Sequence, residues 1–322
     1  MKYRVLIIGL VIFALGAALF FGAWASLGFG AVELSNVEYE KRSREIDWDF
    51  HSLHISESTD DVHIEPAYDG VCRIEYVDSN RHYHKISVEN GCLEISREKK
   101  AQEGSWFDNI TLSTDFEENL LVIYLPEAEY KELTVHTASA DVYAGMGFSF
   151  ERAEIHTASG DVDIGSVVSG KLSVNTASGD IRAGGQALRE MELNTSSGSI
   201  SLGDASVGAE LSLDSTSGDI ELSYVNCGEL EADSASGRIE LRDVIASRSL
   251  DIETTSGDIR LERCDAASLE LESTSGYISG TLLSGKDFDV STNSGDIDLP
   301  SGSRGGKCRI STTSGDIRLS IE

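Results

Sequence analysis

Acidic side chains that recur at a fixed spacing have the clearest potential for chemistry in this sequence. In the C-terminal third, pairs of Asp or Glu separated by one residue recur every 19 or 20 residues, and Asp214 precedes them. On adjacent strands of one sheet, such like charges lie about 4.8 Å apart and repel one another unless a cation intervenes. Oxygen ligands of this kind suit Ca²⁺. The pattern predicts a candidate calcium-binding face formed by Glu231, Asp233, Asp251, Glu253, Glu270, Glu272 and Asp289.

The acidic face also has an explanation that involves no ligand. Charged, solvated side chains keep an exported β-protein soluble and discourage its sheets from stacking on one another. The chain lacks the Gly-Gly-x-Gly-x-Asp repeat of calcium-binding β-rolls. Both interpretations stay open, and no cofactor other than calcium is expected.

Hydroxyl groups recur as regularly as the carboxylates. A serine directly precedes each of ten repeat positions, from Ser139 to Ser314, and a Thr or Ser stands two residues before that serine. Ten identical nucleophiles make no catalytic sense, and no Gly-x-Ser-x-Gly motif occurs. We therefore expect ladders of hydrogen-bonding hydroxyls at one corner of stacked coils. Asp often follows the glycine, where we expect it to accept backbone hydrogen bonds.

Histidine and cysteine give weaker signals. His82 and His84 alternate along one expected strand, and His136 and His156 fall one above the other on adjacent repeats. We expect all four to be surface histidines rather than metal ligands.

The five cysteines are odd in number and contain no Cys-x-x-Cys motif. Cys308 falls at an apolar position of the repeat, which predicts a buried thiol. Cys72 and Cys92 flank expected strands and could pair as a disulfide outside the cell, or remain free. Cys227 and Cys264 fall in segments expected to return the chain from one strand to the next.

A repeat that fills residues 133–322 must position these groups. Apolar residues stand seven and five positions before its glycine and two and four positions after it, as in Leu211, Leu213, Ile220 and Leu222. Alternation of this kind is typical of half-buried strands. We expect the glycine to form a corner by adopting a positive φ. Glycine stands at 160, 179, 198, 218, 237, 257, 276, 295 and 315, and Ala140 holds the first equivalent position.

A fixed period of 19 or 20 residues is typical of stacked identical units. We predict an all-β protein: a single parallel β-solenoid, a right-handed β-helix of 19–20-residue coils, with ten coils over residues 132–322. Residues 51–131 are expected to be a cap with the first irregular coils, including one around Asp60 and a hairpin turn at Asn90-Gly91. The repeat continues to Ile321, which predicts an exposed C-terminal edge available for end-to-end self-association.

The N-terminus predicts a membrane location. Residues 5–31 carry no charge and follow Lys2 and Arg4, so we expect one transmembrane helix over residues 1–31, a linker over residues 32–50, and the rest of the chain outside the cell. A signal peptide cleaved after Ala25 is the alternative. The net charge of −29 makes nucleic acid an unlikely partner.

The repeated pattern L-x-V-x-T-x-S-G-D-I-x-L, the apolar N-terminus and the run LLVIYLPEAEYKELTV at 120–135 resemble a known group. Residues 36–322 are similar to the bacterial putative-adhesin β-strand-repeat family, which includes head-GIN-like and LiaG-like cell-envelope proteins. The resemblance implies a surface β-solenoid without known catalysis, and it transfers no functional residues.

Three functions stay open. The first is a membrane-anchored adhesin or scaffolding module with an unidentified protein or cell-wall partner. The second is an accessory or regulatory protein of an envelope-stress system, which a membrane partner would distinguish. The third is a polysaccharide-acting β-helix enzyme, which requires an irregular cluster of carboxylates with a lone Arg or Lys base. The acids here follow the repeat instead, so we predict no enzyme and no catalytic residues.

Overall fold

The computed structural model of the protein describes residues 38–47, 49–100, 120–165, 167–301 and 304–322. Regular secondary structure within these ranges is entirely β-strand. Residues 39–101 and 117–322 form one compact unit, and a second unit, residues 1–38 and 102–116, lies almost wholly outside the described residues. The transmembrane helix predicted over residues 1–31 also lies outside them. In the part that is described, no helix has the length and apolar character needed to span a membrane.

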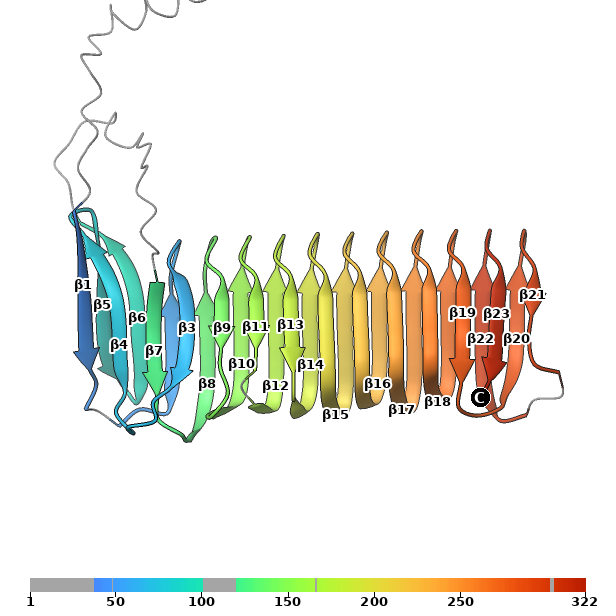
Figure 1. The fold of residues 1–322 in the computed structure, drawn as a ribbon, viewed down its shortest axis with the longest axis horizontal. Helices are drawn as coiled ribbons and strands as arrows, with labels where there is room; N and C mark the ends of the chain where they lie inside the picture. Colours follow the sequence, from blue (N-terminus) through green and yellow to red (C-terminus); the bar gives the residue numbers. More distant parts are fainter. Residues whose placement is uncertain (1–37, 48, 101–119, 166, 302–303) are drawn as a thin grey trace, which may run out of the picture. The chain divides into compact units, whose positions relative to one another are not determined.

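Most of the compact unit is a parallel β-solenoid, as predicted (Figure 1). Equivalent repeat positions pair from coil to coil: Leu211 pairs with Leu230, and Leu230 pairs with Leu250. The stacked strands are β8 (Glu129–His136), β9 (Val142–Ala144), β10 (Ser149–Thr157), β11 (Val162–Ile164), β12 (Val167–Thr176), β13 (Ile181–Gly184), β14 (Ala187–Thr195), β15 (Ile200–Ser215), β16 (Ile220–Ser234), β17 (Ile239–Thr254) and β18 (Ile259–Ser273).

Each regular coil buries three apolar pairs, of which the sequence predicted two. The predicted positions are buried, for example Leu211 and Leu213 at 0% and 1% exposure. The third pair, Val225 and Cys227 in β16, lies in the segment expected to be an irregular return. Strands β15 to β18 continue through that segment for 15 or 16 residues.

Two backbone irregularities explain why the third pair was missed. A residue with positive φ stands six positions after the glycine, as at Tyr224 with φ 56°. A bulge follows, for example between Cys227 and Glu229. Each irregularity shifts the two-residue alternation by one position. The buried positions of the third pair are therefore shifted by one residue relative to the buried positions before and after them. A single two-residue alternation does not predict them.

The corner glycines are required for a reason other than the one predicted. Positive φ among the described glycines occurs at 70, 91, 147, 185 and 280, and none of these is a corner position. Instead, a Cβ on Gly218 would lie 1.7 Å from the carbonyl oxygen of Gly198 in the preceding coil, and the same clash recurs at Gly237. At these glycine corners, close stacking on the preceding coil therefore excludes a side chain.

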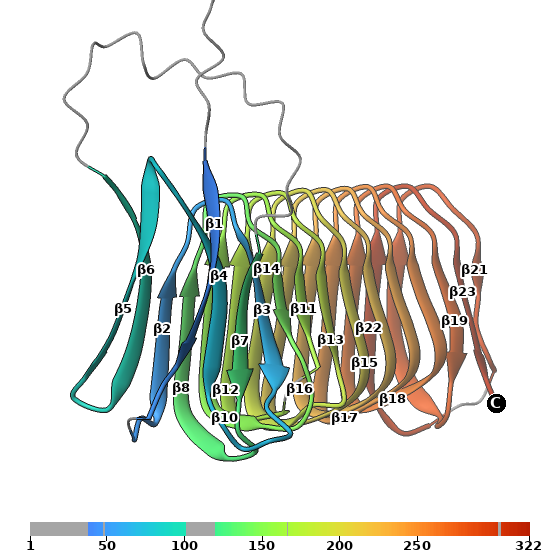
Figure 2. The ribbon, with the colours of Figure 1, turned by 60° about the vertical axis from the view of Figure 1, so that its left-hand side comes forward.

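The N-terminal cap combines antiparallel strands with one more coil (Figure 2). Asn90 and Gly91 both have positive φ and form the predicted hairpin turn between β5 and β6. Residues 39–45, predicted to belong to a linker, form strand β1, which pairs with β4. The cap strands are β1 (Tyr39–Glu45), β4 (Arg73–Ser79), β5 (His82–Glu89), β6 (Cys92–Lys99) and β7 (Leu120–Leu125).

The first coil is formed by β2 (Ser52–Ser56) and β3 (Asp61–Pro66). It lies in register on β8 and β9, with Leu53 opposite Leu133 and Val62 opposite Val142, so the predicted coil around Asp60 is confirmed. On its other side β2 pairs with β6, and β3 pairs with β7. The coil therefore lies between the cap strands and the solenoid.

At the other end, the order of the last two coils is reversed. Strand β22 pairs with both β18 and β20, and β23 pairs with both β19 and β21. The C-terminal coil thus lies inside the stack, and the edge predicted at residues 317–321 is instead formed by β20 and β21 (Figure 1). These strands are β19 (Ile278–Leu282), β20 (Lys286–Thr292), β21 (Ile297–Asp298), β22 (Gly306–Thr312) and β23 (Ile317–Ile321).

All five cysteines are free thiols, so Cys72 and Cys92 do not pair. Cys72 is 5% exposed and belongs to the hydrophobic core, where burial raises the pKa of its thiol to about 12. Cys308 is buried as predicted. Cys227 and Cys264, expected in irregular segments, are also buried because they belong to the third apolar pair.

Candidate functional site

The predicted acidic face is assembled by the register of the coils. Four positions before the corner, Asp214, Asp233, Glu253 and Glu272 follow one another on adjacent coils. Two positions earlier, Glu231, Asp251 and Glu270 form a parallel column. The structure therefore brings together six of the seven predicted residues and adds Asp214.

Asp289 is separated from the other six. Because the last two coils are reversed, Arg309 lies between Glu270 and Asp289. An Arg309 nitrogen lies 3.2 Å from Glu270 Oε1, and Ser311 Oγ donates a hydrogen bond of 3.2 Å to Glu272 Oε1. The acidic face therefore ends where a cation and a hydroxyl group meet its last carboxylates.

Burial and neighbouring carboxylates raise the pKa values of two aspartates in the acidic face. Burial, then the neighbouring carboxylates beginning with Asp214, raise the pKa of Asp233 to about 6. Burial and nearby carboxylates also raise the pKa of Asp251 above its usual value. A groove of about 340 Å³ is lined by Asp214, Asp233 and Glu253 together with hydroxyl side chains of the corner. A cation placed in this groove would reduce the repulsion.

The carboxylates of the acidic face remain spread along the coils. In the described part of the chain, Glu57, Asp60 and His84 form the one group of three potential ligands whose atoms all lie within 4.8 Å of one another. The acidic face therefore offers successive pairs of oxygens rather than one closed ligand cage, and calcium binding there stays a prediction.

The buried hydroxyl groups at the corners form hydrogen bonds that join neighbouring coils. Thr176 Oγ1 accepts the Gly179 N–H at 3.0 Å and donates to the Gly160 carbonyl of the preceding coil at 3.4 Å. The serines next to the glycines are exposed, for example Ser178 and Ser197. Two hydroxyl ladders were predicted. The row of Thr and Ser three positions before the corner is buried and joins the coils, and the row of serines next to the glycines lies at the surface.

The aspartates after the glycines also join neighbouring coils, as predicted. The carboxylate of Asp161 accepts the Asp180 N–H at 2.8 Å, and Asp180 accepts the Ser199 N–H at the same distance. A carboxylate that accepts the backbone amide of the next coil links the stack beside each corner. Most of these residues are therefore structural.

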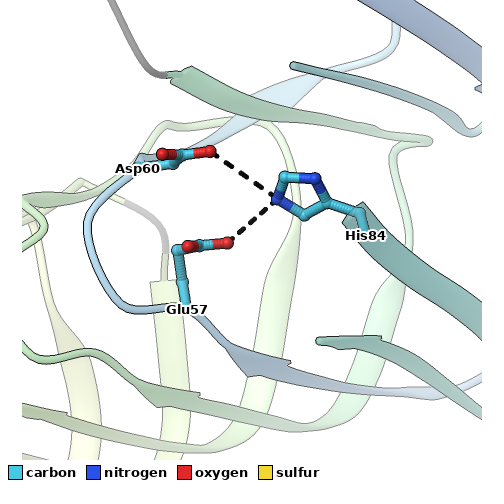
Figure 3. Close-up of side chains that lie close together, drawn as sticks. All are labelled: Glu57, Asp60 and His84. Atoms are coloured by element: carbon cyan, nitrogen blue, oxygen red, sulfur yellow. Dashed lines mark hydrogen bonds and ion pairs between the residues drawn. The ribbon is translucent and has the colours of Figure 1, made fainter. Parts of the chain in front are cut away.

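A second cluster of charged side chains lies buried in the N-terminal cap (Figure 3). Glu57 and Asp60 belong to the corner between β2 and β3, and His84 comes from β5. His84 Nε2 lies 3.0 Å from Glu57 Oε2 and 3.7 Å from Asp60 Oδ2. His84 Nδ1 lies 3.1 Å from Asp78 Oδ1. These side chains are at most 5% exposed.

Arginine closes one side of this cap cluster. Arg97 donates to Glu57 Oε1 at 3.3 Å, to Thr59 Oγ1 at 2.9 Å, and to Asp60 Oδ1. Burial raises the pKa of Asp60, and the charge of Arg97 only partly offsets this rise. Burial opposes the ionised forms of Glu57 and His84, but their mutual hydrogen bond outweighs it together with the hydrogen bonds from Ser58 and to Asp78 and the opposite charges nearby, so the pKa of Glu57 is lowered and that of His84 is raised.

The sequence contained one signal for the cap cluster. Glu57 stands where other repeats have a buried Thr or Ser, and Asp60 stands where they have the corner glycine. Acids at two positions that are otherwise structural mark an unusual corner. His84 was expected at the surface, and it is buried because β5 packs this side of the hairpin against the corner. Asp78 and Arg97 gave no signal, since nothing local links them to residue 60.

The remaining histidines lie at the surface as expected. His136 and His156 stack on adjacent coils, with ring centroids 5.2 Å apart and planes 8° from parallel. His156 Nε2 also lies 2.8 Å from Glu154 Oε1. His82 is partly exposed on β5.

Solved structures resemble the chain only distantly. A "putative lipid binding protein" from Parabacteroides distasonis is 20% identical, with a TM-score of 0.41, over 88% of this chain and 97% of that one. A "putative adhesin" from Bacteroides fragilis is 11% identical, with a TM-score of 0.40 and the same coverage. At these scores no functional conclusion follows from the likeness.

No curated protein matches the chain. The family model described as Toastrack DUF4097 matches residues 50–244 and 208–322, which together include the first coil and the whole solenoid. The match covers more than half of the sequence, and its bounds agree with the stacked coils of the structure. The chain belongs to the Toastrack DUF4097 family.

Proposed function

We propose that this chain is a non-enzymatic binding module, anchored in a bacterial cell membrane by residues 5–31, whose solenoid lies outside the cell and binds ligands through its acidic face. The observation that supports this most directly is the register of the carboxylates. From Asp214 to Glu272, each coil places an acidic side chain directly beside that of the next coil. The distance between neighbours is then one strand spacing, about 4.8 Å.

The regularity of the acidic face favours binding over catalysis. A catalytic centre uses a few groups whose environments drive their pKa values apart. Here the side chains of successive coils are chemically equivalent, and each follows the repeat. A surface of this kind is suited to an extended ligand that makes the same contact several times.

The ligand must carry positive charge, because the carboxylates lie side by side on adjacent coils, and burial together with these neighbours raises the pKa of Asp233 and Asp251. Two cations fit this requirement. Ca²⁺ would be held by Glu231, Asp233, Asp251, Glu253, Glu270 and Glu272, with Asp289 excluded by the position of Arg309. A polycationic peptide segment would place one ammonium or guanidinium group per coil.

A pair of matched variants tests the acidic face. The full chain in detergent is titrated by calorimetry with a pentalysine peptide and, separately, with CaCl₂. Asp233→Asn combined with Glu253→Gln removes two charges from the face, and we expect about tenfold weaker peptide binding. Asp163→Asn combined with Glu221→Gln removes the same charge from exposed positions elsewhere on the coils, and we expect less than about a twofold change.

Equal losses in both double variants would show that only net charge matters and would contradict the proposal. For calcium, equal melting temperatures in CaCl₂ and in chelator would remove that ligand. The membrane location is tested by adding a protease to intact cells. Digestion of the solenoid is expected, and complete protection would contradict an outward orientation.

A further inference from the structure

The cap cluster departs from the repeat at the two positions that the architecture constrains most. In regular coils, the position three before the corner holds a hydroxyl that joins two coils, and the corner holds a glycine that admits no Cβ. In the first coil these positions are Glu57 and Asp60. The strands that cover the outer side of this coil are β6 and β7. Because β6 and β7 pair with this coil on that side, an aspartate side chain fits at this corner. The backbone alone would need only a glycine here.

One carboxylate oxygen in the cluster has no hydrogen-bond donor. Asp60 is 1% exposed, and its Oδ2 atom accepts no hydrogen bond. Arg97 binds the other oxygen, Oδ1. A buried carboxylate oxygen without a hydrogen-bond donor is costly, and such atoms in native proteins commonly contact a bound water or ion. Asp60 Oδ2 is directed toward His84 Nε2, 3.7 Å away (Figure 3).

The partners of the cluster leave three ligand atoms facing one another. Arg97 and the Ser58 N–H occupy Glu57 Oε1, so Glu57 Oε2 is directed toward the ring. Asp78 Oδ1 accepts the backbone N–H of His84 at 2.8 Å and faces Nδ1 at 3.1 Å. A proton on Nδ1 places the Nε2 lone pair opposite two carboxylates, which repels them unless a cation lies between.

We propose that Glu57 Oε2, Asp60 Oδ2 and His84 Nε2 bind a divalent transition-metal ion, with Zn²⁺ as the best-fitting ion. In a tetrahedral zinc site with bond lengths near 2.1 Å, ligand atoms lie about 3.4 Å apart. The distances from Nε2 to the two oxygens, 3.0 and 3.7 Å, lie on either side of that value. A nitrogen with two carboxylates suits zinc better than Ca²⁺ or Mg²⁺, which prefer oxygen ligands alone.

The charge of the cluster agrees with a bound cation. Glu57, Asp60 and Asp78 carry three negative charges, and Arg97 with Arg42, which lies 3.5 Å from Asp78 Oδ2, carries two positive ones. With neutral His84 the cluster carries a net charge of −1 in a buried site, which attracts a cation; a divalent ion would bring the sum to +1. Asp78 orients the ring from the second coordination shell, as carboxylates do in many histidine–zinc sites.

The ion would join elements that are distant in the sequence. Glu57 and Asp60 belong to the first coil, and His84 belongs to the β5–β6 hairpin. Metal binding would thus fasten the hairpin to the end of the solenoid and contribute its binding free energy to the stability of the cap. The three ligand side chains are 0–1% exposed, so a water molecule inside the cap would supply the fourth ligand of a tetrahedral ion.

The test uses the full chain in detergent, treated with a chelator and then dialysed. Titration with ZnCl₂ by calorimetry is expected to show one saturable site, and Zn²⁺ is expected to raise the melting temperature. Co²⁺ in place of Zn²⁺ is expected to give the visible absorption of a four-coordinate ion. Asp60→Asn and His84→Gln are expected to weaken Zn²⁺ binding more than 100-fold, and Asp78→Asn by about 10- to 100-fold.

Two controls separate this cluster from other zinc ligands. His82→Gln, on the same strand, and His136→Gln with His156→Gln, on the stacked pair, are expected to leave the affinity unchanged. Loss of binding in either control would place the ion elsewhere and overturn the proposal. If Asp60→Asn and His84→Gln do not fold, the wild-type chain still decides. Absence of saturable Zn²⁺ binding would overturn the proposal. It would show that a proton on His84, and not a metal ion, links the ring to the carboxylates.

Discussion

Replacing one corner glycine by alanine tests the stacking that underlies the whole solenoid. In Gly218→Ala, the added Cβ would lie 1.7 Å from the carbonyl oxygen of Gly198. An ordinary contact between these atoms is at least about 3.4 Å, so the two corners must separate by about 1.7 Å. Neither atom is the flexible end of a side chain, and the backbone itself has to move.

The hydrogen bonds at the corner set the cost of that movement. Ser217 N–H donates to the Ser196 carbonyl at 3.1 Å, and Ser215 Oγ donates to the Gly198 carbonyl at 3.2 Å. A separation of about 1.7 Å lengthens both well beyond hydrogen-bonding distance. Two lost bonds at about 1 kcal/mol each, together with a buried carbonyl left unpaired, give a destabilisation of about 3 kcal/mol.

Gly208→Ala is the matched control, because the nearest atom to its added Cβ is the Leu188 carbonyl oxygen at 3.8 Å. We expect this variant to remain within about 1 kcal/mol of the wild type. Urea unfolding followed by circular dichroism measures the difference, and hydrogen exchange locates it, since the loss should concentrate in β15 and β16. Equal unfolding midpoints for the two variants would refute the argument from corner stacking.

Three further outcomes are expected from the same structure. Ser234→Ala leaves the Gly237 N–H without its 2.9 Å acceptor and should cost about 1–3 kcal/mol in urea unfolding, whereas the exposed Ser236→Ala should cost less than about 0.5 kcal/mol. The pKa of Asp233 in the folded state is raised to about 6, so the ionised carboxylate destabilises the fold at neutral pH. Asp233→Asn should therefore be more stable than the wild type near pH 7.5. This advantage should disappear as the pH falls toward about 4. Ile297, 48% exposed on the edge strand β21, should support end-to-end association, so Ile297→Lys should lower the sedimentation-derived mass of concentrated full chain; a monomeric wild type would contradict this.

The regular part of the fold could be predicted because every coil repeats the same physical requirement. Two apolar pairs alternate around the corner, and the period is constant, so stacking follows from the pattern. The third pair, Val225 and Cys227, could not be predicted this way, because a positive φ at Tyr224 and the following bulge shift the alternation. The residues with positive φ at these positions are polar or aromatic, and their types give no sign that the backbone shifts there.

The reversed order of the last two coils was also beyond the sequence. The corner glycines at 276, 295 and 315 are equivalent, and each satisfies the same contact in either order. In the structure Gly315 meets the carbonyl of Gly276, and Gly295 meets that of Gly315. The residues between β21 and β22 carry no sequence pattern that distinguishes the two arrangements. The predicted terminal edge was therefore placed on the wrong coil.

The same stacking that makes the fold predictable confines function to a small set of positions. Inward positions are committed to the apolar core, the corner glycines to close contact, and the buried hydroxyls to the bonds between coils. Only outward positions and the ends of the stack can vary without breaking a contact that the next coil needs. The acidic face is formed by outward positions. Glu57 and Asp60 lie at an end of the stack, at the one described corner where an acid replaces glycine. In a solenoid of this kind, departures from the repeat are therefore a better guide to function than the repeat itself.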